Sequence, residues 1–419
     1  MIRNIFKIIW TERKVNLWIL LELILVFCIL WFCVDFLYFV ANRYFEPKGY
    51  DIENVYSINI SAKDDGQIND STTEERKDSL LNYFWTICDR IRLYPEIESL
   101  SVSMDASPYS SSYRSTGFKN DTITHSFRLK TVNPEYFDVF RMKLEEGKMF
   151  TFGDKKEVVI SKNKDGRLHS GNVTLSDTLR NAYDENSVTL KIVGIVNPSK
   201  RSEFDEIRPV VHWALQKNDH NLINYINQTE INVRVKPEMD KDFAERFMKN
   251  MQEQLSVGPY FVSSVQSFEE VRSGYINEYN DELKSVYSIT AFILINIFLA
   301  VVGTFWFRVQ TRNSEIGLRL ALGSSKAKVK NLFIYETLIL LFIASIISVA
   351  ICVNVTMVNV LQSIGLPSVN REWFPIETFQ YFVNYGVTFL FLAVIAVVAV
   401  WYPAKKASDI QPAIALRDE

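Results

Sequence analysis

The sequence predicts an integral membrane protein with an all-α part of four transmembrane helices and an α+β extracytoplasmic domain. Two observations predict this fold class. Four apolar runs are each long enough to cross a bilayer core of about 30 Å, which takes about 20 helical residues. A polar segment, 42–284, separates the first run from the second and alternates between strand and helix patterns.

The first run, predicted as a transmembrane helix at 17–41, follows the basic residues Arg3, Lys7, Arg13 and Lys14. A signal peptide also begins with basic residues. This run, however, is longer than the 7–15 apolar residues of a signal sequence, and no small-residue cleavage site follows it. We therefore predict a retained membrane anchor.

The polar segment begins and ends with a similar unit of strand, helix and strand. The first unit lies in 50–106 and the second in 216–267, and we interpret them as a pseudo-symmetric α+β layer. The predicted elements, in chain order, are Asn54–Ile60, Glu74–Arg92 and Ile97–Met104, then Glu230–Val235, Asp240–Leu255 and Tyr260–Val265.

Between the two units, segment 107–215 is rich in strands and turns. Its predicted strands are Ser126–Val132, Glu157–Ser161 and Thr189–Val196, so we interpret it as a β-rich insert. Segment 268–284 contains no proline and predicts a stalk helix that continues into the second apolar run. With the end of the first run it would form two stalks, through which movement of the membrane helices would move the outer domain.

The distribution of Lys and Arg predicts the orientation. Basic residues are dense before the first run, in the loop 308–331 and in the tail 403–419, whereas the loop 359–380 contains only Arg371. Because basic loops stay in the cytoplasm, both termini and the loop 308–331 are predicted to be cytoplasmic. The remaining transmembrane helices are predicted at 285–307, 332–358 and 381–402.

No catalytic or nucleotide-binding motif occurs in the sequence. It lacks a Walker-type phosphate loop, a G-x-S-x-G nucleophile elbow and an H-E-x-x-H zinc motif. The four histidines show no spacing typical of metal ligands, and a net charge of −3 gives no reason to expect nucleic-acid binding. We predict no enzyme activity, no metal and no cofactor bound by this chain.

Three acidic residues, Glu22, Asp35 and Glu336, lie in or near the apolar runs. Charges in a membrane are costly and are therefore functional candidates. Three interpretations remain open at this stage: pairing at an interface or between helices, conformational coupling, and ion or proton movement.

The loop between the second and third apolar runs predicts a short helical elbow. Ser314–Leu322 is predicted to be a helix, and Gly323 to be the left-handed residue after its end. Ser324 or Ser325 would then cap the next helix. One side would be basic, with Ile316, Leu320 and Leu322 on the other. A lipid-anchored basic loop is the alternative. Gly317 inside a helix costs about 1 kcal/mol relative to alanine and so indicates a close contact.

The elbow residues from Glu315, E-I-G-L-R-L-A-L-G-S-S, with Glu336 after them, resemble the signature of the MacB/FtsX-like permeases of ABC transporters. The tail from Pro403, P-A-K-K-A-S-D-I-Q-P-A-I-A-L-R, resembles the closing motif of that family. In the polar segment, V-N-P-E-Y-F-D-V-F from Val132, E-G-K-M-F from Glu146 and I-V-G-I-V from Ile192 resemble its MacB-like periplasmic core domain.

The resemblance implies a stand-alone permease in a bacterial inner membrane, paired with a second permease chain as a homo- or heterodimer. A separate cytoplasmic ABC ATPase would bind the ATP. Segment 1–16 would be an amphipathic helix on the inner surface, and the outer domain would act on a periplasmic or outer-membrane partner. The residues implied in ATPase coupling are Arg312, Glu315, Ile316, Gly317, Arg319, Ala321, Leu322, Gly323 and Ser324.

Segment Ser161–Asp177 departs from the family, because it contains a polar stretch where the family has a hydrophobic helix. Two readings share this fold. In the first, the permease transmits ATP-driven movement to an outer lipoprotein, peptide or efflux partner. In the second, it is a signalling scaffold that regulates an outer cell-wall hydrolase without transport. An unrelated membrane-anchored enzyme is the third reading, and no catalytic motif supports it.

Overall fold

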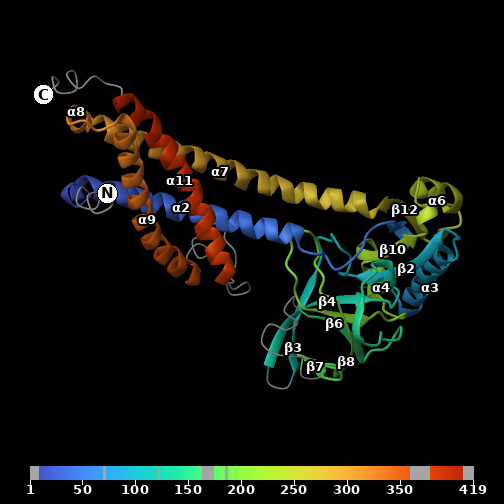
Figure 1. Cartoon of the computed structure of the whole chain (residues 1–419). Coiled ribbons are helices and arrows are strands. Elements are labelled where there is room, and N and C mark those ends of the chain that lie inside the picture. The colour runs from blue at the N-terminus through green and yellow to red at the C-terminus, as the bar shows by residue number, and fades with distance from the viewer. Residues whose placement is uncertain are drawn as a thin grey trace. The chain divides into compact units, whose positions relative to one another are not determined.

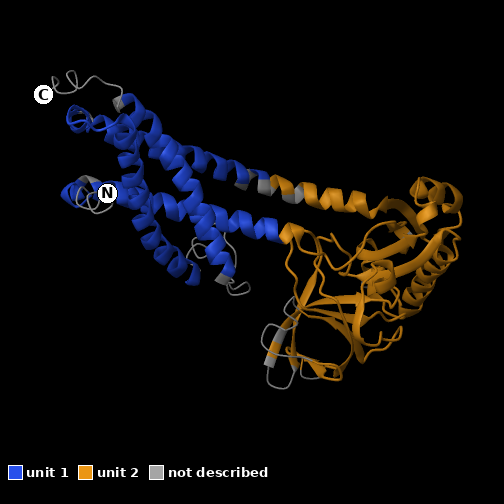
Figure 2. Ribbon diagram, viewed as in Figure 1, with its two compact units in different colours: residues 1–42, 282–419 blue, residues 43–281 orange. Residues whose placement is uncertain are grey.

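The computed structural model describes residues 9–68, 72–120, 123–162, 174–184, 187–358 and 378–408. The chain forms two compact units (Figure 2). We call the first, Met1–Asn42 with Glu282–Glu419, the helical unit. We call the second, Arg43–Asp281, the α+β unit.

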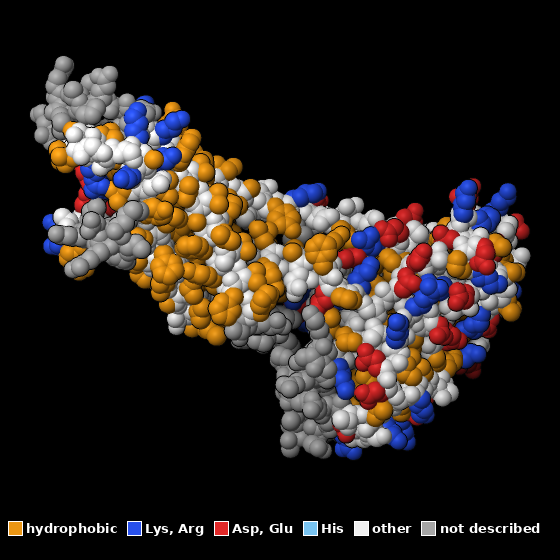
Figure 3. Space-filling view, viewed as in Figure 1, with side chains coloured by type: hydrophobic (Ala, Val, Ile, Leu, Met, Phe, Trp, Pro, Cys, Tyr) orange, Lys and Arg blue, Asp and Glu red, His pale blue; other side chains and the backbone are white. Residues whose placement is uncertain are grey.

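Within the described residues, four helices are long and apolar enough to span a membrane, as predicted. They are α2 (Arg13–Phe45), α7 (Phe268–Gln310), α9 (Lys326–Met357) and α11 (Thr378–Ser408) (Figure 1). Helices α2 and α11 extend beyond their predicted spans at both ends and α9 at its start, because flanking polar residues continue the helix. Helix α7 includes the predicted stalk 268–284. Figure 3 shows hydrophobic side chains gathered over the helical unit and charged side chains over the α+β unit. This division is the one expected for a protein that is partly immersed in lipid.

The two βαβ-like units of the α+β unit are present. The first consists of β1 (Val55–Ala62), α3 (Glu74–Arg92) and β2 (Ile97–Met104), and the second of β10 (Thr229–Val235), α6 (Phe243–Met251) and β12 (Tyr260–Ser267). The predicted helix at 240–255 was too long, because Asp242 adopts a left-handed φ of 54° and α6 begins after it.

The two units interleave in space. The strand order is β12-β1-β10-β2, and every neighbouring pair is antiparallel. Each unit therefore has a strand of the other unit between its own two strands, which is the split βαβ arrangement of ferredoxin-like folds. Helices α3 and α6 pack on this sheet, and Leu80, Phe84, Phe243 and Phe247 lie fully buried in the shared core.

The insert between the two units closes into a ring of strands. The pairing runs from β4 (Ile123–Val132) through β3 (Arg114–Asn120), β7 (Thr178–Asn181), β8 (Leu190–Val196), β6 (Glu157–Ser161) and β9 (Val210–Ala214) back to β4. A closed ring leaves none of these strands as an open edge. Phe118, Phe127 and Ile192 belong to the core that fills it. Two residue pairs join β4 to β2, so the barrel continues the sheet of the interleaved units.

Shorter elements complete the unit: η1 (Asp64–Gly66), α4 (Tyr136–Val139), β5 (Leu144–Gly147), α5 (Asn221–Asn224), η2 (Ile226–Gln228), η3 (Pro237–Met239) and β11 (Ser256–Val257). Most of the polar stretch predicted after Ser161 lies outside the described residues. The same holds for most of the loop 359–380 and for the tail after Ser408.

Two glycines allow β5 to lie against β8. Gly147 has a φ of +81°, and a Cβ atom added there would lie 2.2 Å from the carbonyl oxygen of Val193. Its strand partner Gly194 would place a Cβ 2.3 Å from the carbonyl oxygen of Lys148. The glycine in the E-G-K-M-F motif is therefore required by both backbone conformation and space.

We expect Gly147→Ala to lower the free energy of unfolding by more than about 3 kcal/mol. The left-handed backbone accounts for about 1–2 kcal/mol, and displacement of β8 for the rest. Gly153→Ala is the control, because Gly153 has a φ of +82° but no atom within 4 Å of an added Cβ. Loss of the β-sheet circular dichroism signal on heating measures both variants. Equal destabilisation would contradict the role assigned to close packing.

Candidate functional site

A buried carboxylate links the ends of three elements in the helical unit. Glu336 of α9 is 1% exposed. One of its oxygens accepts a hydrogen bond from Arg308 Nη2 at 2.5 Å, and the other accepts from Arg312 Nη1 at 2.9 Å. Arg308 lies in the last turn of α7 and also donates to Asn16 of α2. Glu336 therefore pairs between helices, and conformational coupling and ion or proton movement stay predictions.

The other two acidic residues are paired as well. Glu22 of α2 accepts a hydrogen bond from the hydroxyl of Thr304 of α7, at 2.9 and 2.8 Å to its two oxygens. Asp35 accepts from the side-chain amides of Gln380 and Asn384 of α11, at 2.9 and 2.7 Å. Each of the three carboxylates therefore connects different helices of the bundle, which satisfies its need for hydrogen bonds in an apolar environment.

The predicted elbow is a short helix, α8 (Asn313–Ala321). The N–H of Ser324 donates to the carbonyl of Arg319, and the N–H of Gly323 donates to the carbonyl of Leu320. With Gly323 at a φ of +86°, these bonds form a Schellman motif, which confirms the predicted end of the helix. Ser325 accepts a hydrogen bond from the backbone N–H of Lys328 and caps α9.

Charged pairs fix α8 to the helices around it. Arg312 precedes α8 and donates to Glu315 at 2.6 Å as well as to Glu336. Its guanidinium also lies over the Phe333 ring, 4.9 Å from the centroid. Glu315 in turn accepts a hydrogen bond from Arg319 at 2.5 Å. The charges of the signature therefore hold the elbow in position through contacts within the chain.

Two leucines of the elbow, Leu318 and Leu322, are exposed, and only Leu322 was among the residues named from the sequence. Ile316 is 1% exposed and packs in the core of the helical unit, and Gly317 is also buried. Leu322 was expected beside Ile316, but it is 78% exposed, and Leu318 is 51% exposed. A spacing of four residues places both leucines on one face of α8 and its C-terminal end. Ala321 and Gly323 are exposed beside them, and Ser324 is half-buried.

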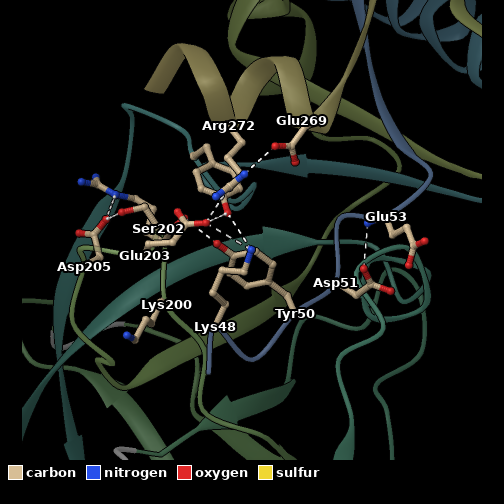
Figure 4. A network of polar contacts seen from close by, with 12 residues as sticks. Lys48, Tyr50, Asp51, Glu53, Lys200, Ser202, Glu203, Asp205, Glu269 and Arg272 are labelled. Carbon is tan, nitrogen blue, oxygen red and sulfur yellow. Dashed lines mark hydrogen bonds and ion pairs between the residues drawn. The ribbon is translucent and has the colours of Figure 1, made fainter. Parts of the chain in front are cut away.

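A second cluster lies in the α+β unit, around the segment Ser199–Glu206, which we call the clasp (Figure 4). Glu203 accepts hydrogen bonds from Arg272 Nε at 2.7 Å and Tyr109 Oη at 2.9 Å, and Lys48 Nζ lies 3.3 Å away. Burial alone would raise the pKa of Glu203, but the hydrogen bonds from Arg272 and Tyr109 and the charge of Lys48 lower it.

The clasp contacts the end of α2 and the start of α7 within this unit. Lys200 Nζ is fully buried and donates to the carbonyl oxygen of Arg43 at 2.6 Å. Arg43 forms an ion pair with Glu206 at 3.2 Å, and Tyr275 donates to Asp205 at 3.4 Å. Sequence reasoning missed this cluster. The dense alternation of charge between Lys200 and Arg208 was the signal available.

Comparison with known proteins identifies the family. Residues 40–250, half of the chain, match the family described as the MacB-like periplasmic core domain. Residues 287–412 match the FtsX-like permease C-terminal family. The chain belongs to the MacB/FtsX family of ABC transporter permeases. In this MacB/FtsX permease the first match covers most of the α+β unit, and the second covers α8, α9, α11 and the apolar part of α7.

Curated relatives are similar over much of the permease. The macrolide export ATP-binding/permease protein MacB of Neisseria meningitidis (strain MC58) is 23% identical over 269 residues, which cover 62% of this chain and 40% of the relative. MacB of Acinetobacter baylyi is 23% identical over 322 residues, which cover 75% of this chain and 45% of the relative. The permease thus spans about two fifths of the length of the curated relatives it matches.

Solved structures of two extracytoplasmic domains are also similar. The extracellular domain of the noncanonic ABC-type transporter YknZ, from Gram-positive bacteria, has a TM-score of 0.31 and 14% identity. The match covers 50% of this chain and all of that domain. The periplasmic region of MacB from Actinobacillus actinomycetemcomitans has a TM-score of 0.33 and 14% identity, and the match covers 56% of this chain and 98% of that region.

We expect Glu336→Gln to lower the stability of the helical unit by about 3 kcal/mol, because two buried guanidinium groups would lose their shared counter-charge. Thermal unfolding of the full chain in detergent, followed by the helical circular dichroism signal, measures the loss. Lys328→Gln is the control, because Lys328 is an exposed residue of the same helix and its replacement is expected to change stability by less than about 0.5 kcal/mol. Equal midpoints for the wild type and Glu336→Gln would contradict the assigned role.

We expect Glu203→Gln to speed up amide hydrogen exchange in the clasp, because Arg272 and Lys48 lose a charged hydrogen-bond acceptor. Hydrogen bonds to such a charged group contribute about 1.5–3 kcal/mol. The pKa of Glu203 is lowered in the folded chain, so its ionised form stabilises the fold. This contribution to stability is fully present above the pKa of about 4.3 in the unfolded chain, and it is lost as the pH falls through the folded-state pKa. Hydrogen exchange measured by mass spectrometry at pH 7 reports the protection of 199–206.

Glu269→Gln is the matched control for this experiment. Glu269 also pairs with Arg272, but its side chain is 65% exposed, so its replacement should change exchange little. Unchanged protection in Glu203→Gln would show that the clasp does not depend on this carboxylate.

Proposed function

We propose that this permease is the membrane subunit of an ABC machine in a bacterial inner membrane, driven by a separate cytoplasmic ATPase that docks on α8. The observation that carries the proposal is the exposed pair Leu318 and Leu322 on a helix held by buried ion pairs. Exposed leucines on a rigid element are typical of an interface, since their burial by a partner is favourable and costs little ordering.

The basic residues around the elbow support its placement in the cytoplasm. Lys326, Lys328 and Lys330 follow α8 closely, and Lys405 and Lys406 lie near the end of α11. By the positive-inside rule, these ends lie in the cytoplasm, and the α+β unit lies outside. The names of the relatives join ATP-binding and permease activities in one protein, which supports an ATPase partner for this permease.

The ion pairs of Glu336 offer a route for transmission. An ATPase that moves α8 would move Arg312, and through Glu336 it would move Arg308 and the end of α7. Because α7 is one helix from Phe268 to Gln310, displacement at its inner end would reach Arg272 and the clasp. A second permease chain would complete the machine. The α+β unit would act on a lipoprotein, a peptide or an efflux partner outside the membrane.

We expect the double variant Leu318→Ser, Leu322→Ser to weaken ATPase binding at least about tenfold, or about 1.4 kcal/mol, while leaving the fold intact. Pull-down of the tagged full chain from its native membranes, with assay of the retained ATPase activity, measures the loss. Lys328→Ser, another exposed change near the elbow, is the control and should retain the ATPase.

Glu315 and Gly317 are less suitable targets. Glu315 bonds to Arg312 and Arg319, and Gly317 is buried, so changes there would disturb α8 itself. Full ATPase retention by the double leucine variant would contradict docking on this face. Absence of any ATPase from the wild-type pull-down would overturn the motor assignment. Retention of an outer hydrolase whose activity needs the ATPase, with no cargo moved, would favour the signalling scaffold.

A further inference from the structure

A basic hollow lies in the α+β unit where the barrel strands β3 and β4 approach the clasp. Its cavity volume is about 20 Å³, about the room that one water-sized group needs, and it opens to solvent. The inner space therefore has room for one small polar group. Five cationic residues and one acidic residue line it: Arg114, Arg128, Lys130, Lys200, Arg201 and Asp105.

The carboxylates around the hollow only partly neutralise these cations. Asp105 pairs with Arg114 at 2.6 Å, and Glu46 pairs with Lys200 at 3.0 Å. Asp205 is shared between Arg128 at 3.6 Å and Arg201 at 3.3 Å. Three carboxylates therefore form ion pairs with four of the five cations, and Glu230 attracts Lys130 without pairing with it. Among the described residues, no carboxylate forms an ion pair with Lys130, whose hydrogen-bond partner is the Tyr136 hydroxyl at 3.0 Å.

Two buried donors in the wall lack partners among the described residues. Ser199 is 4% exposed, and its hydroxyl has no hydrogen-bond partner. Arg128 Nε is also buried without a partner, although its side chain pairs with Asp205. A buried polar group without a partner costs free energy, so each of these two donors would gain from an acceptor placed beside it.

The Tyr113 ring orients the guanidinium groups. Arg128 lies 5.6 Å and Arg201 5.1 Å from its centroid, so both guanidinium groups contact this one ring. Fixed guanidinium groups are suited to oxyanions, because two parallel N–H groups match two oxygens. An anion in the hollow would also relieve repulsion among the cations.

We propose that this hollow binds a single oxyanion, a carboxylate or phosphate-like group, held by Arg128, Lys130 and Ser199. The proposal does not depend on the identity of the ATPase or on its docking face. The group would be presented by a free ligand or by a partner of the α+β unit. Since Ser199, Lys200 and Arg201 also belong to the clasp, the bound oxyanion would contact the segment that holds the end of α2 and the start of α7.

Lys130 gives the site a pH dependence. Burial lowers the pKa of Lys130 to about 8, assisted by Arg128 and Arg201 and opposed by Glu230. His212 and Tyr136 also lie near it, and burial keeps His212 neutral, with a pKa of about 3. Oxyanion binding requires the charged ammonium, so affinity should fall as the pH rises through 8.

Equilibrium dialysis of the full chain in lipid nanodiscs with radiolabelled sulfate tests the site, because sulfate does not titrate between pH 6 and 9.5. We expect saturable binding at pH 6, weakened about tenfold by Lys130→Gln and unaffected by Lys249→Gln, an exposed control on α6. Ser199→Ala removes one hydroxyl at little risk to folding and should weaken binding severalfold. If acetate competes with sulfate, the site accepts carboxylates. If acetate does not compete, the site is specific for tetrahedral oxyanions.

Three outcomes would overturn the proposal. The first is that the folded wild type shows no saturable binding of sulfate or acetate. The second is that Lys130→Gln and Lys249→Gln bind sulfate equally well. The third is that the affinity for sulfate does not fall between pH 6 and 9.5. Circular dichroism of each variant identifies any loss of binding that comes from unfolding. Because ATPase pull-down is measured separately, failure of this site and failure of the proposed function are distinguishable.

Discussion

The two-sided pairing of Glu336 is the interaction on which the helical unit depends. A carboxylate at 1% exposure must have its charge compensated, and the two guanidinium groups come from the last turn of α7 and from the residue before α8. The same pairing sets the start of the elbow and ties it to α9. The exposed leucines of α8 are thus presented by a helix whose position is fixed by buried electrostatics.

Helix α7 is held by ion pairs in both units. In the helical unit Arg308 and Glu336 are buried, whereas in the α+β unit Arg272 and Glu203 form part of a wider network with Lys48 and Tyr109. Partly exposed pairs can exchange partners at lower cost than buried ones. Arg272 is 26% exposed, whereas the side chains of Arg308 and Glu336 are 5% and 2% exposed, so the clasp pair is better suited to rearrangement than the Glu336 pair.

Local patterns were sufficient to predict much of the fold. The apolar spacing of Leu80, Phe84 and Ile91 predicted α3 to the residue, and the four membrane helices followed from length and hydropathy. Strand order was not predictable, because β1 pairs with β10 across the whole insert. The clasp was missed since Glu203 contacts residues distant in sequence. The exposure of Leu322 was missed because nine helical residues do not determine which face the neighbouring helices cover.

The interleaved sheet has a consequence for how this protein is made. Ile58 of β1 pairs with Ile231 of β10, 173 residues later, and β2 also depends on β10 for its partner on that side. The first βαβ unit cannot complete its half of the sheet until β10 has been synthesised, so its strands have unpaired edges while the barrel is being made. Such edges are prone to aggregation. Assembly of the α+β unit is therefore a late and largely concerted event, which lengthens the time for which these strand edges stay exposed.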